Sequence, residues 1–297
     1  MSKQEKIVLS EERLSRYLTP YKYPEPVLIG SGETGAFDEQ AVDISFVFWH
    51  GDCFHMLYTG FDGVGYQSAL ATSDDLLHWE HKGIILPRRL DTDRWDRVGG
   101  SATWMIKESN NLYDLPTLKK VDGKYWLVYH SYPQQGYEVG PAEIGLAWTT
   151  GEELLDWNFP DEPIYSWKNG GDWEKGGLYK ACLIDHDGLW YLFYNAKDEG
   201  QPWFEQTGLA TSKDLKQWER HPDNPLLRVT PDAWDQRFVA EPCILKDDDL
   251  WVNFYFGLGP GHAQEGLAYS KDLIHWTKHP EPIIRHGEKG DYDQTHA

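Results

Sequence analysis

A short phrase that recurs four times along the chain limits the possible folds more than any other feature. Its copies end in Leu-x-x-Trp and are ATSDDLLHW (71–79), AWTTGEELLDW (147–157), ATSKDLKQW (210–218) and AYSKDLIHW (268–276). A turn and an alternating apolar run precede the phrase, as in DGKYWLVYH (122–130) and DGLWYLFYN (187–195). A turn signal followed by period-two alternation predicts half-buried strands, so the chain repeats one β-rich unit.

An aromatic residue followed by an acid opens each repeating unit. These pairs are Phe37-Asp38, Trp95-Asp96, Trp173-Glu174, Trp234-Asp235 and Tyr292-Asp293. Each complete unit has room for four antiparallel strands, the content of one propeller blade. We therefore predict an all-β fold, a five-bladed β-propeller of four-stranded antiparallel blades whose fifth blade is incomplete in this chain. A linear β-solenoid is the alternative, but its repeats are shorter.

The repeats divide the chain into two parts. Residues 1–25 are predicted to form an N-terminal extension with a short helix capped by Ser10, with Arg13 and Arg16 on its exposed face. Residues 26–297 are predicted to form the catalytic propeller, with blades starting near 37, 95, 173, 234 and 292. Residues 26–32 would add a closing strand to the last blade. An open ring exposes a strand edge, so a homo-oligomer is expected.

Charge and composition limit the partners. The chain has 48 acidic and 28 basic residues, and its net charge of −20 repels nucleic acids and anionic membranes. A neutral oligosaccharide is a compatible partner. The first residues lack the apolar core of a signal peptide and no run is long enough to span a membrane, which predicts a cytoplasmic protein. The sparse cysteines Cys53, Cys182 and Cys243 are expected to be buried thiols.

Charged residues open the innermost strands. Counting back eight residues from the first turn of each unit gives Asp43, Lys180 and Glu241, and Asp114 stands close to the same position in the longer second unit. Innermost strands run along the propeller axis, so we expect these side chains to meet at one end of it. Glycoside hydrolysis needs one carboxylic acid and one carboxylate in such a place. The alternative is that these acids only cap strand ends.

Further candidates for substrate binding come from the loops on the same face. We expect Trp203 and His262 from two strand-connecting loops, Trp104 from the insertion of the second unit, and His296 at the start of a fifth innermost strand. Aromatic planes stack on sugar rings and imidazoles bond to hydroxyls. Packing between blades is the alternative for each aromatic residue. The sequence has no H-E-x-x-H, C-x-x-C or Walker motif, so no cofactor is expected to be required, although a structural metal ion in the axial channel is compatible with the pattern.

The combination of A-x-S-x-D-L-x-x-W, D-G-x-[YW]-x-L-x-Y and strand-opening acids resembles the five-bladed propeller glycosidases. These include the arabinanase and β-xylosidase group (family 43), the invertase group (family 32) and their relatives. The resemblance spans residues 26–297. It implies that Asp43 acts as base or nucleophile, that Asp114 orients the sugar and tunes a pKa, and that Glu241 donates the proton. Lys180 departs from the pattern, because it stands where the family usually has the proton-donating glutamate.

These observations predict a glycoside hydrolase that cleaves an oligosaccharide with a carboxylate pair. Two alternatives stay open. One is a propeller that binds carbohydrate without catalysis, and the other is a phosphate-dependent glycoside phosphorylase, for which Arg97, Arg237 and Lys180 would supply a basic pocket. The hydrolase mechanism requires Asp43 and Glu241 to face one cavity.

Overall fold

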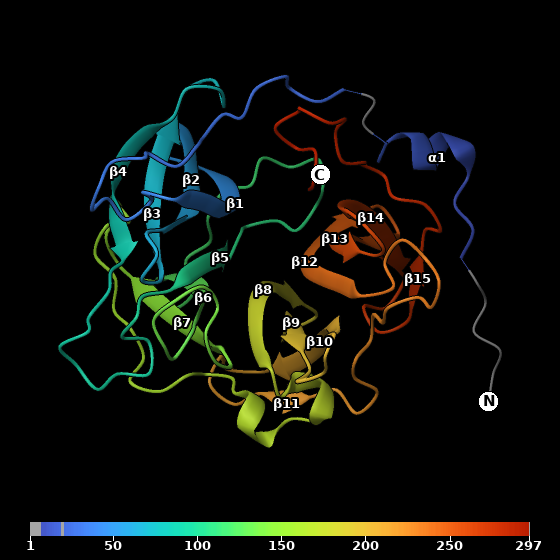
Figure 1. Ribbon diagram of the computed structural model, residues 1–297. Coiled ribbons are helices and arrows are strands. Elements are labelled where there is room, and N and C mark those ends of the chain that lie inside the picture. Colours follow the sequence, from blue (N-terminus) through green and yellow to red (C-terminus); the bar gives the residue numbers. More distant parts are fainter. Residues whose placement is uncertain (1–6, 19–20, 297) are drawn as a thin grey trace.

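The computed structural model describes residues 7–18 and 21–296, and its strands form antiparallel sheets arranged around a common centre (Figure 1). The first blade consists of β1 (Ala41–His50), β2 (Cys53–Phe61), β3 (Tyr66–Ser73) and β4 (Glu80–Leu86), paired in chain order. The second blade consists of β5 (Ser101–Met105), β6 (Tyr125–Ser131) and β7 (Glu143–Thr149).

The third and fourth blades repeat the pattern. The third contains β8 (Gly177–His186), β9 (Leu189–Lys197), β10 (Glu205–Ser212) and β11 (Glu219–Arg220). The fourth contains β12 (Phe238–Asp247), β13 (Leu250–Leu258), β14 (Ala263–Ser270) and β15 (Trp276–Lys278). Strands β1, β5, β8 and β12 lie nearest the centre (Figure 1). The predicted all-β propeller architecture is confirmed, and the count of five blades stays a prediction.

The second blade differs from the predicted four strands. Beyond β7 its outer edge has only isolated bridges, from Trp148 to Asn158 and from Ile144 to Tyr165. Its insertion follows the innermost strand β5 and does not precede it, which corrects the expected order. The insertion reaches across the molecule, because the Trp49 N–H donates to the Pro116 carbonyl at 3.0 Å and the Lys246 N–H donates to the Asn110 carbonyl at 2.7 Å. It thereby links the ends of β1 and β12.

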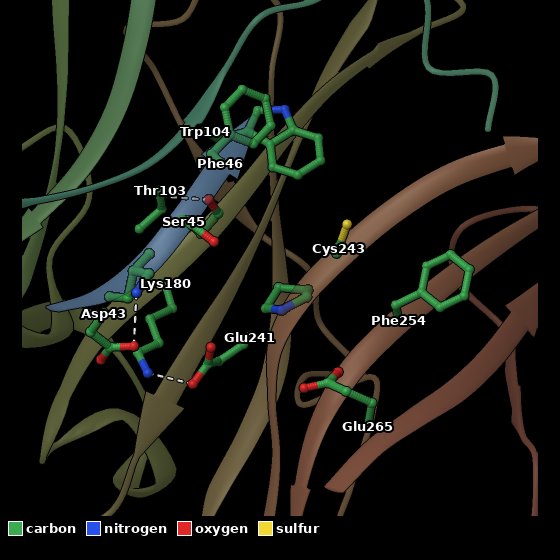
Figure 2. A pocket seen from close by; sticks show the side chains of 13 residues that line it. Asp43, Ser45, Phe46, Thr103, Trp104, Lys180, Glu241, Cys243, Phe254 and Glu265 are labelled. Carbon is green, nitrogen blue, oxygen red and sulfur yellow. Dashed lines mark hydrogen bonds and ion pairs between the residues drawn. The ribbon is translucent and has the colours of Figure 1, made fainter. Parts of the chain in front are cut away.

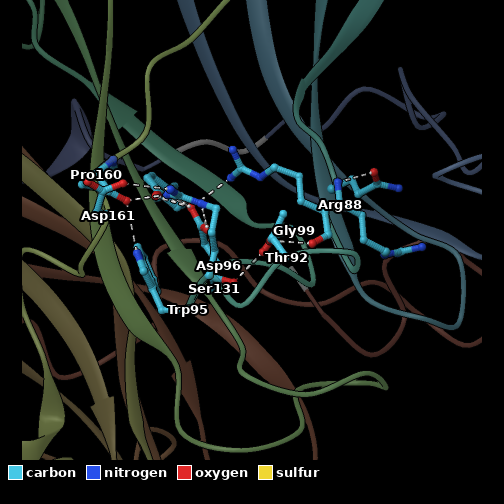
Figure 3. A network of polar contacts seen from close by, with 12 residues as sticks. Arg88, Thr92, Trp95, Asp96, Gly99, Ser131, Pro160 and Asp161 are labelled. Carbon is cyan, nitrogen blue, oxygen red and sulfur yellow. Dashed lines mark hydrogen bonds and ion pairs between the residues drawn. The ribbon is translucent and has the colours of Figure 1, made fainter.

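The aromatic-acid pairs that open the units have a structural role. In the fourth blade Trp234 stacks on Tyr255 with ring centroids 5.8 Å apart, and Asp235 accepts a hydrogen bond from the Tyr255 hydroxyl at 3.0 Å. The Lys278 ammonium lies 2.6 Å from the same carboxylate. Figure 3 shows the corresponding network of the second blade around Trp95 and Asp96. Buried carboxylates are tolerated here because each has a charged and a hydroxyl partner.

The Leu-x-x-Trp turns lie at the opposite end of the blades from the start of β1. In the first blade Asp75 accepts hydrogen bonds from the N–H groups of Leu77 and His78 at 2.9 and 2.8 Å. Leu76 takes a left-handed backbone conformation with φ of 67°, and the corresponding Leu215 and Leu273 do the same. The side-chain hydrogen bonds of the turn compensate for this unfavourable conformation.

The N-terminal segment packs against the fourth blade. Helix α1 (Glu11–Ser15) begins after Ser10, whose hydroxyl accepts the Arg13 N–H at 3.2 Å as predicted. Arg13 was expected to be exposed, but its guanidinium binds Asp247 at 3.2 Å and Asp249 at 2.7 Å. Residues 26–32 form no strand, which corrects the predicted closing strand. No helix within the described ranges is long and apolar enough to cross a membrane.

The three cysteines carry free thiols. Cys182 is buried as expected, whereas Cys53 and Cys243 are half-buried. Burial raises the pKa of the Cys243 thiol to about 11, so the thiol is un-ionised at neutral pH.

Candidate active site

Three innermost strands share a β-bulge at the same height along the axis. The strand pairing shifts register between Asp43 and Phe46 in β1, between Tyr179 and Cys182 in β8, and between Ala240 and Cys243 in β12. The bulged residues are left-handed, with φ values of 46° for Ile44, 49° for Lys180 and 52° for Glu241. Bulges commonly re-aim side chains beside active sites.

The bulges correct the predicted register of the first blade. Pairing of His50 with Cys53, and of Asp247 with Leu250, shows that Gly51 corresponds to Asp248 and not to Asp249. Ile44 is therefore the counterpart of Lys180 and Glu241, and Asp43 stands one residue earlier. The extra residue of a bulge changes the direction in which neighbouring side chains point.

Asp43, Lys180 and Glu241 nevertheless line one cavity of about 340 Å³ (Figure 2). Its walls also include Thr103 and Trp104 of β5, Cys243 of β12, and Phe254 and Glu265 of the outer strands of the fourth blade. The innermost strands of all four blades thus contribute to the cavity. The requirement that Asp43 and Glu241 face a common space is met.

Lys180 is the central cation of this cavity. Its ammonium forms an ion pair with Glu241, and the exposed side-chain fractions are 15% for the lysine and 31% for the glutamate. Burial acts to lower the pKa of Lys180, but the charges of Glu241 and Asp43 outweigh burial and raise it. The lysine therefore stays charged and stabilises neighbouring carboxylates. The Asp43 carboxylate also accepts the backbone N–H of Ile44 at 2.7 Å.

Glu241 and Glu265 together favour the retention of a proton. Burial raises the pKa of Glu241, although the Lys180 ammonium acts in the opposite direction. Burial, followed by the charge of Glu241, raises the pKa of Glu265 to about 8. Within the part of the chain that the structure describes, no hydrogen bond or ion pair reaches the Glu265 carboxyl. The site therefore holds at least one protonated carboxyl group at neutral pH.

Sequence reasoning missed Glu265, although a signal was present. Strand pairing places it at the position that Ser68, Ile144 and Thr207 occupy in the other three blades. A carboxylate at one copy of a position that is elsewhere uncharged marks a departure from the repeat. Departures of this kind deserve priority when a repeat protein is searched for a site.

Asp114 and Trp104 lie elsewhere than expected. Asp114 does not line the cavity of Asp43 and Glu241, because the insertion that contains it leaves the far end of β5. Its carboxylate accepts the Ser109 hydroxyl at 2.6 Å. Trp104 belongs to β5 and not to a loop, is buried, and packs against Phe46 with ring centroids 4.8 Å apart. It lines the cavity as part of a wall.

The remaining substrate-binding candidates surround the cavity without lining it. Trp203 is half-exposed in a neighbouring cavity of about 390 Å³, and its indole N–H donates to Glu205 at 2.9 Å. His262 is exposed and stacks on His286 at 4.1 Å between ring centroids. His296 stacks on Phe256 at 6.1 Å and pairs with Ala263 of β14. Phe238 pairs with Glu205 in the same way, so His296 does occupy the start of a further innermost segment.

No group of three or more His, Cys, Asp or Glu side chains suited to a metal ion occurs in residues 7–18 and 21–296. The charged groups that line the cavity are the carboxyl groups of Asp43, Glu241 and Glu265 and the ammonium group of Lys180.

Comparisons with known proteins agree with this fold. No family model matches the chain. A solved structure of a BT0996 complex with RGII is 29% identical, with a TM-score of 0.81 over 97% of this chain and 86% of that protein. A second one, described as a glycoside hydrolase, is 28% identical with the same TM-score and coverage. A thermostable family-43 glycoside hydrolase shares the fold at a TM-score of 0.59 and 17% identity, over 88% of this chain and 78% of that protein.

Curated relatives include phosphorylases. The 1,2-β-oligomannan phosphorylase of Thermoanaerobacter sp. is 29% identical over 40% of this chain, and the β-1,2-mannobiose phosphorylase of the same strain is 27% identical over 40%. The aligned segments cover only 42% and 43% of the lengths of these enzymes. The fold is that of the propeller glycoside hydrolases, as the sequence resemblance implied.

Proposed function

We propose that this protein is a glycoside hydrolase that cleaves an oligosaccharide at the cavity between the innermost strands. The observation that carries the proposal is the meeting of Asp43, Glu241 and Glu265 around one cavity, with Lys180 bound to one of them. The combination of a proton-holding carboxyl and an ionised carboxylate is what hydrolysis of a glycosidic bond requires. A likeness of 28% to a glycoside hydrolase over 97% of the chain supports the same reaction.

Each group has a role in this reaction. Glu241 donates a proton to the leaving oxygen, and Glu265 beside it keeps the pair protonated at neutral pH. Asp43 activates water or attacks the sugar, and Lys180 keeps Asp43 ionised through its charge. Asp114 has no part in this mechanism, because it lies outside the cavity.

The substrate is a neutral sugar chain that offers a terminal unit. Carboxylates outnumber cations in the cavity, so an anionic sugar would be repelled. A volume of about 340 Å³ is at the lower end of ligand-sized pockets, which favours entry of one end of the chain. The expected cytoplasmic location, homo-oligomer and lack of a required cofactor stay predictions.

Phosphorolysis is the second candidate, favoured by the likeness to two β-1,2-mannoside phosphorylases. The nearby lysines argue against it, because Lys180 pairs with Glu241 and Lys197 lies 3.9 Å from Glu138. Arg237 is the better phosphate ligand. Its guanidinium lies 5.2 Å from the Trp203 ring, and its Nε finds no acceptor among the described residues. A phosphorylase would use that group.

The test is a panel of nitrophenyl glycosides and natural oligosaccharides, β-1,2-mannobiose included, assayed with and without inorganic phosphate. A hydrolase turns over a member of the panel without phosphate and releases the free sugar. Turnover that depends on phosphate and releases a sugar phosphate would establish the phosphorylase. Saturable binding without turnover would establish a carbohydrate-binding propeller.

Two variants test the roles. Glu241→Gln should slow cleavage of natural linkages by roughly two to four orders of magnitude, with a much smaller loss for nitrophenyl leaving groups. Asp43→Asn should abolish activity on both kinds of substrate. Equal losses on good and poor leaving groups for Glu241→Gln would remove the proton-donor role from Glu241, and Glu265→Gln is then the variant to examine.

A further inference from the structure

A second cavity of about 280 Å³ continues the axial channel beneath the candidate active site. It shares Ser45, Phe46, Trp104 and Cys243 with the upper cavity. Its remaining walls come mostly from the insertion of the second blade, including Lys107, Ser109, Asn111 and Asp114. The lower cavity is therefore separate from the carboxylates of the upper one and has its own chemistry.

Lys107 is the unusual residue of the lower cavity. It is only 6% exposed, yet within residues 7–18 and 21–296 no carboxylate forms an ion pair with it and no acceptor forms a hydrogen bond with its ammonium. The ammonium lies 4.6 Å from the Trp104 ring centroid. Burial lowers the pKa of Lys107, and the ionisable neighbours that act on it are the thiols of Cys243 and Cys182. A buried ammonium without a counter-charge is costly.

A second donor in the same wall lacks an acceptor. The Trp104 indole Nε1 is buried and unpaired among the described residues. Asp114 is the nearest candidate counter-charge, but it is exposed, its carboxylate accepts the Ser109 hydroxyl, and no ion pair joins it to Lys107. Two unsatisfied donors and no acceptor define a site that would accept negative charge.

We propose that the lower cavity is a binding site for a small inorganic anion such as chloride, held by the Lys107 ammonium. The anion supplies the missing counter-charge at the point where the insertion meets β5 and β12. The same ammonium repels cations, so this part of the axial channel is unsuited to the metal ion that the sequence left open. The site is independent of the hydrolase proposal, because none of the three carboxylates of that mechanism takes part.

Thermal unfolding in chloride, with gluconate to keep ionic strength constant, tests this site. Gluconate is too large and too strongly hydrated to replace chloride in a buried cavity. Chloride should raise the midpoint of the wild type saturably, by about 2–6 °C. Lys107→Met should remove this dependence and be no less stable than the wild type without chloride. Lys124→Met is the matched control, because Lys124 also lies over a tryptophan, at 3.8 Å from the Trp148 ring, but lines no part of this cavity.

A chloride effect that persists in Lys107→Met, or is absent from the wild type, would overturn the proposal. Crystals grown in bromide give a direct readout that does not depend on the variant. An anomalous peak beside Lys107 supports the site, and an empty cavity in bromide-containing crystals refutes it.

Discussion

Replacing Glu265 by glutamine should make the protein more stable in mildly alkaline buffer and leave its stability in acid nearly unchanged. The folded protein raises the pKa of this carboxyl from 4.5 to about 8, chiefly through burial and then through the charge of Glu241. The folded state therefore binds the proton more tightly than the unfolded chain does. Glutamine resembles the protonated carboxyl in shape and cannot lose a proton.

The sign of the effect follows from linkage. A group whose folded pKa lies above its unfolded pKa stabilises the protein fully below the unfolded value and loses that contribution as pH rises through the folded value. The relevant window is thus pH 4.5 to about 8. The shift corresponds to an upper limit of about 5 kcal/mol. Solvent in the open cavity reduces this, so we expect Glu265→Gln to gain about 2–4 kcal/mol over the wild type near pH 8.5.

Urea unfolding at pH 5 and pH 8.5, at constant ionic strength, measures the difference directly. Glu153→Gln is the control, because Glu153 is exposed and outside the cavity. It should follow the wild type at both pH values. If the difference between Glu265→Gln and the wild type is the same at both pH values, Glu265 is not protonated in the folded protein. The proposed proton-holding pair would then be wrong.

Three further changes test the framework. Asp235→Ala leaves the Lys278 ammonium and the Tyr255 hydroxyl without their acceptor, and urea unfolding should show a loss of about 3–5 kcal/mol. Arg13→Met removes the guanidinium that binds the buried Asp247, and should cost about 2–4 kcal/mol by the same assay, whereas Arg16→Met should stay within about 0.5 kcal/mol. Gly266→Ala would place a methyl group 2.4 Å from the Tyr255 ring, so its thermal midpoint should fall by about 3–8 °C; an unchanged midpoint would show that the stacked ring can move aside.

Much of this protein could be predicted because its information is local and repeated. The alternation of apolar residues fixes strands such as β6 and β9, and the Asp-Leu-x-x-Trp phrase fixes the turn at one end of the blade through its own side-chain hydrogen bonds. Repetition then places Asp43, Lys180 and Glu241 near one end of the axis. These conclusions need no knowledge of which blade neighbours which.

Only the tertiary structure decided the details of the site. The sequence is equally compatible with the second blade's insertion before or after its innermost strand, and the wrong choice placed Asp114 in the site. Each bulge adds a residue that shifts side-chain direction by one position, so the register of Asp43 against Glu241 could not be counted. Glu265 and Lys107 gain their properties from burial by neighbours distant in the chain, because a pKa depends on the surroundings of the folded group and not on its residue type.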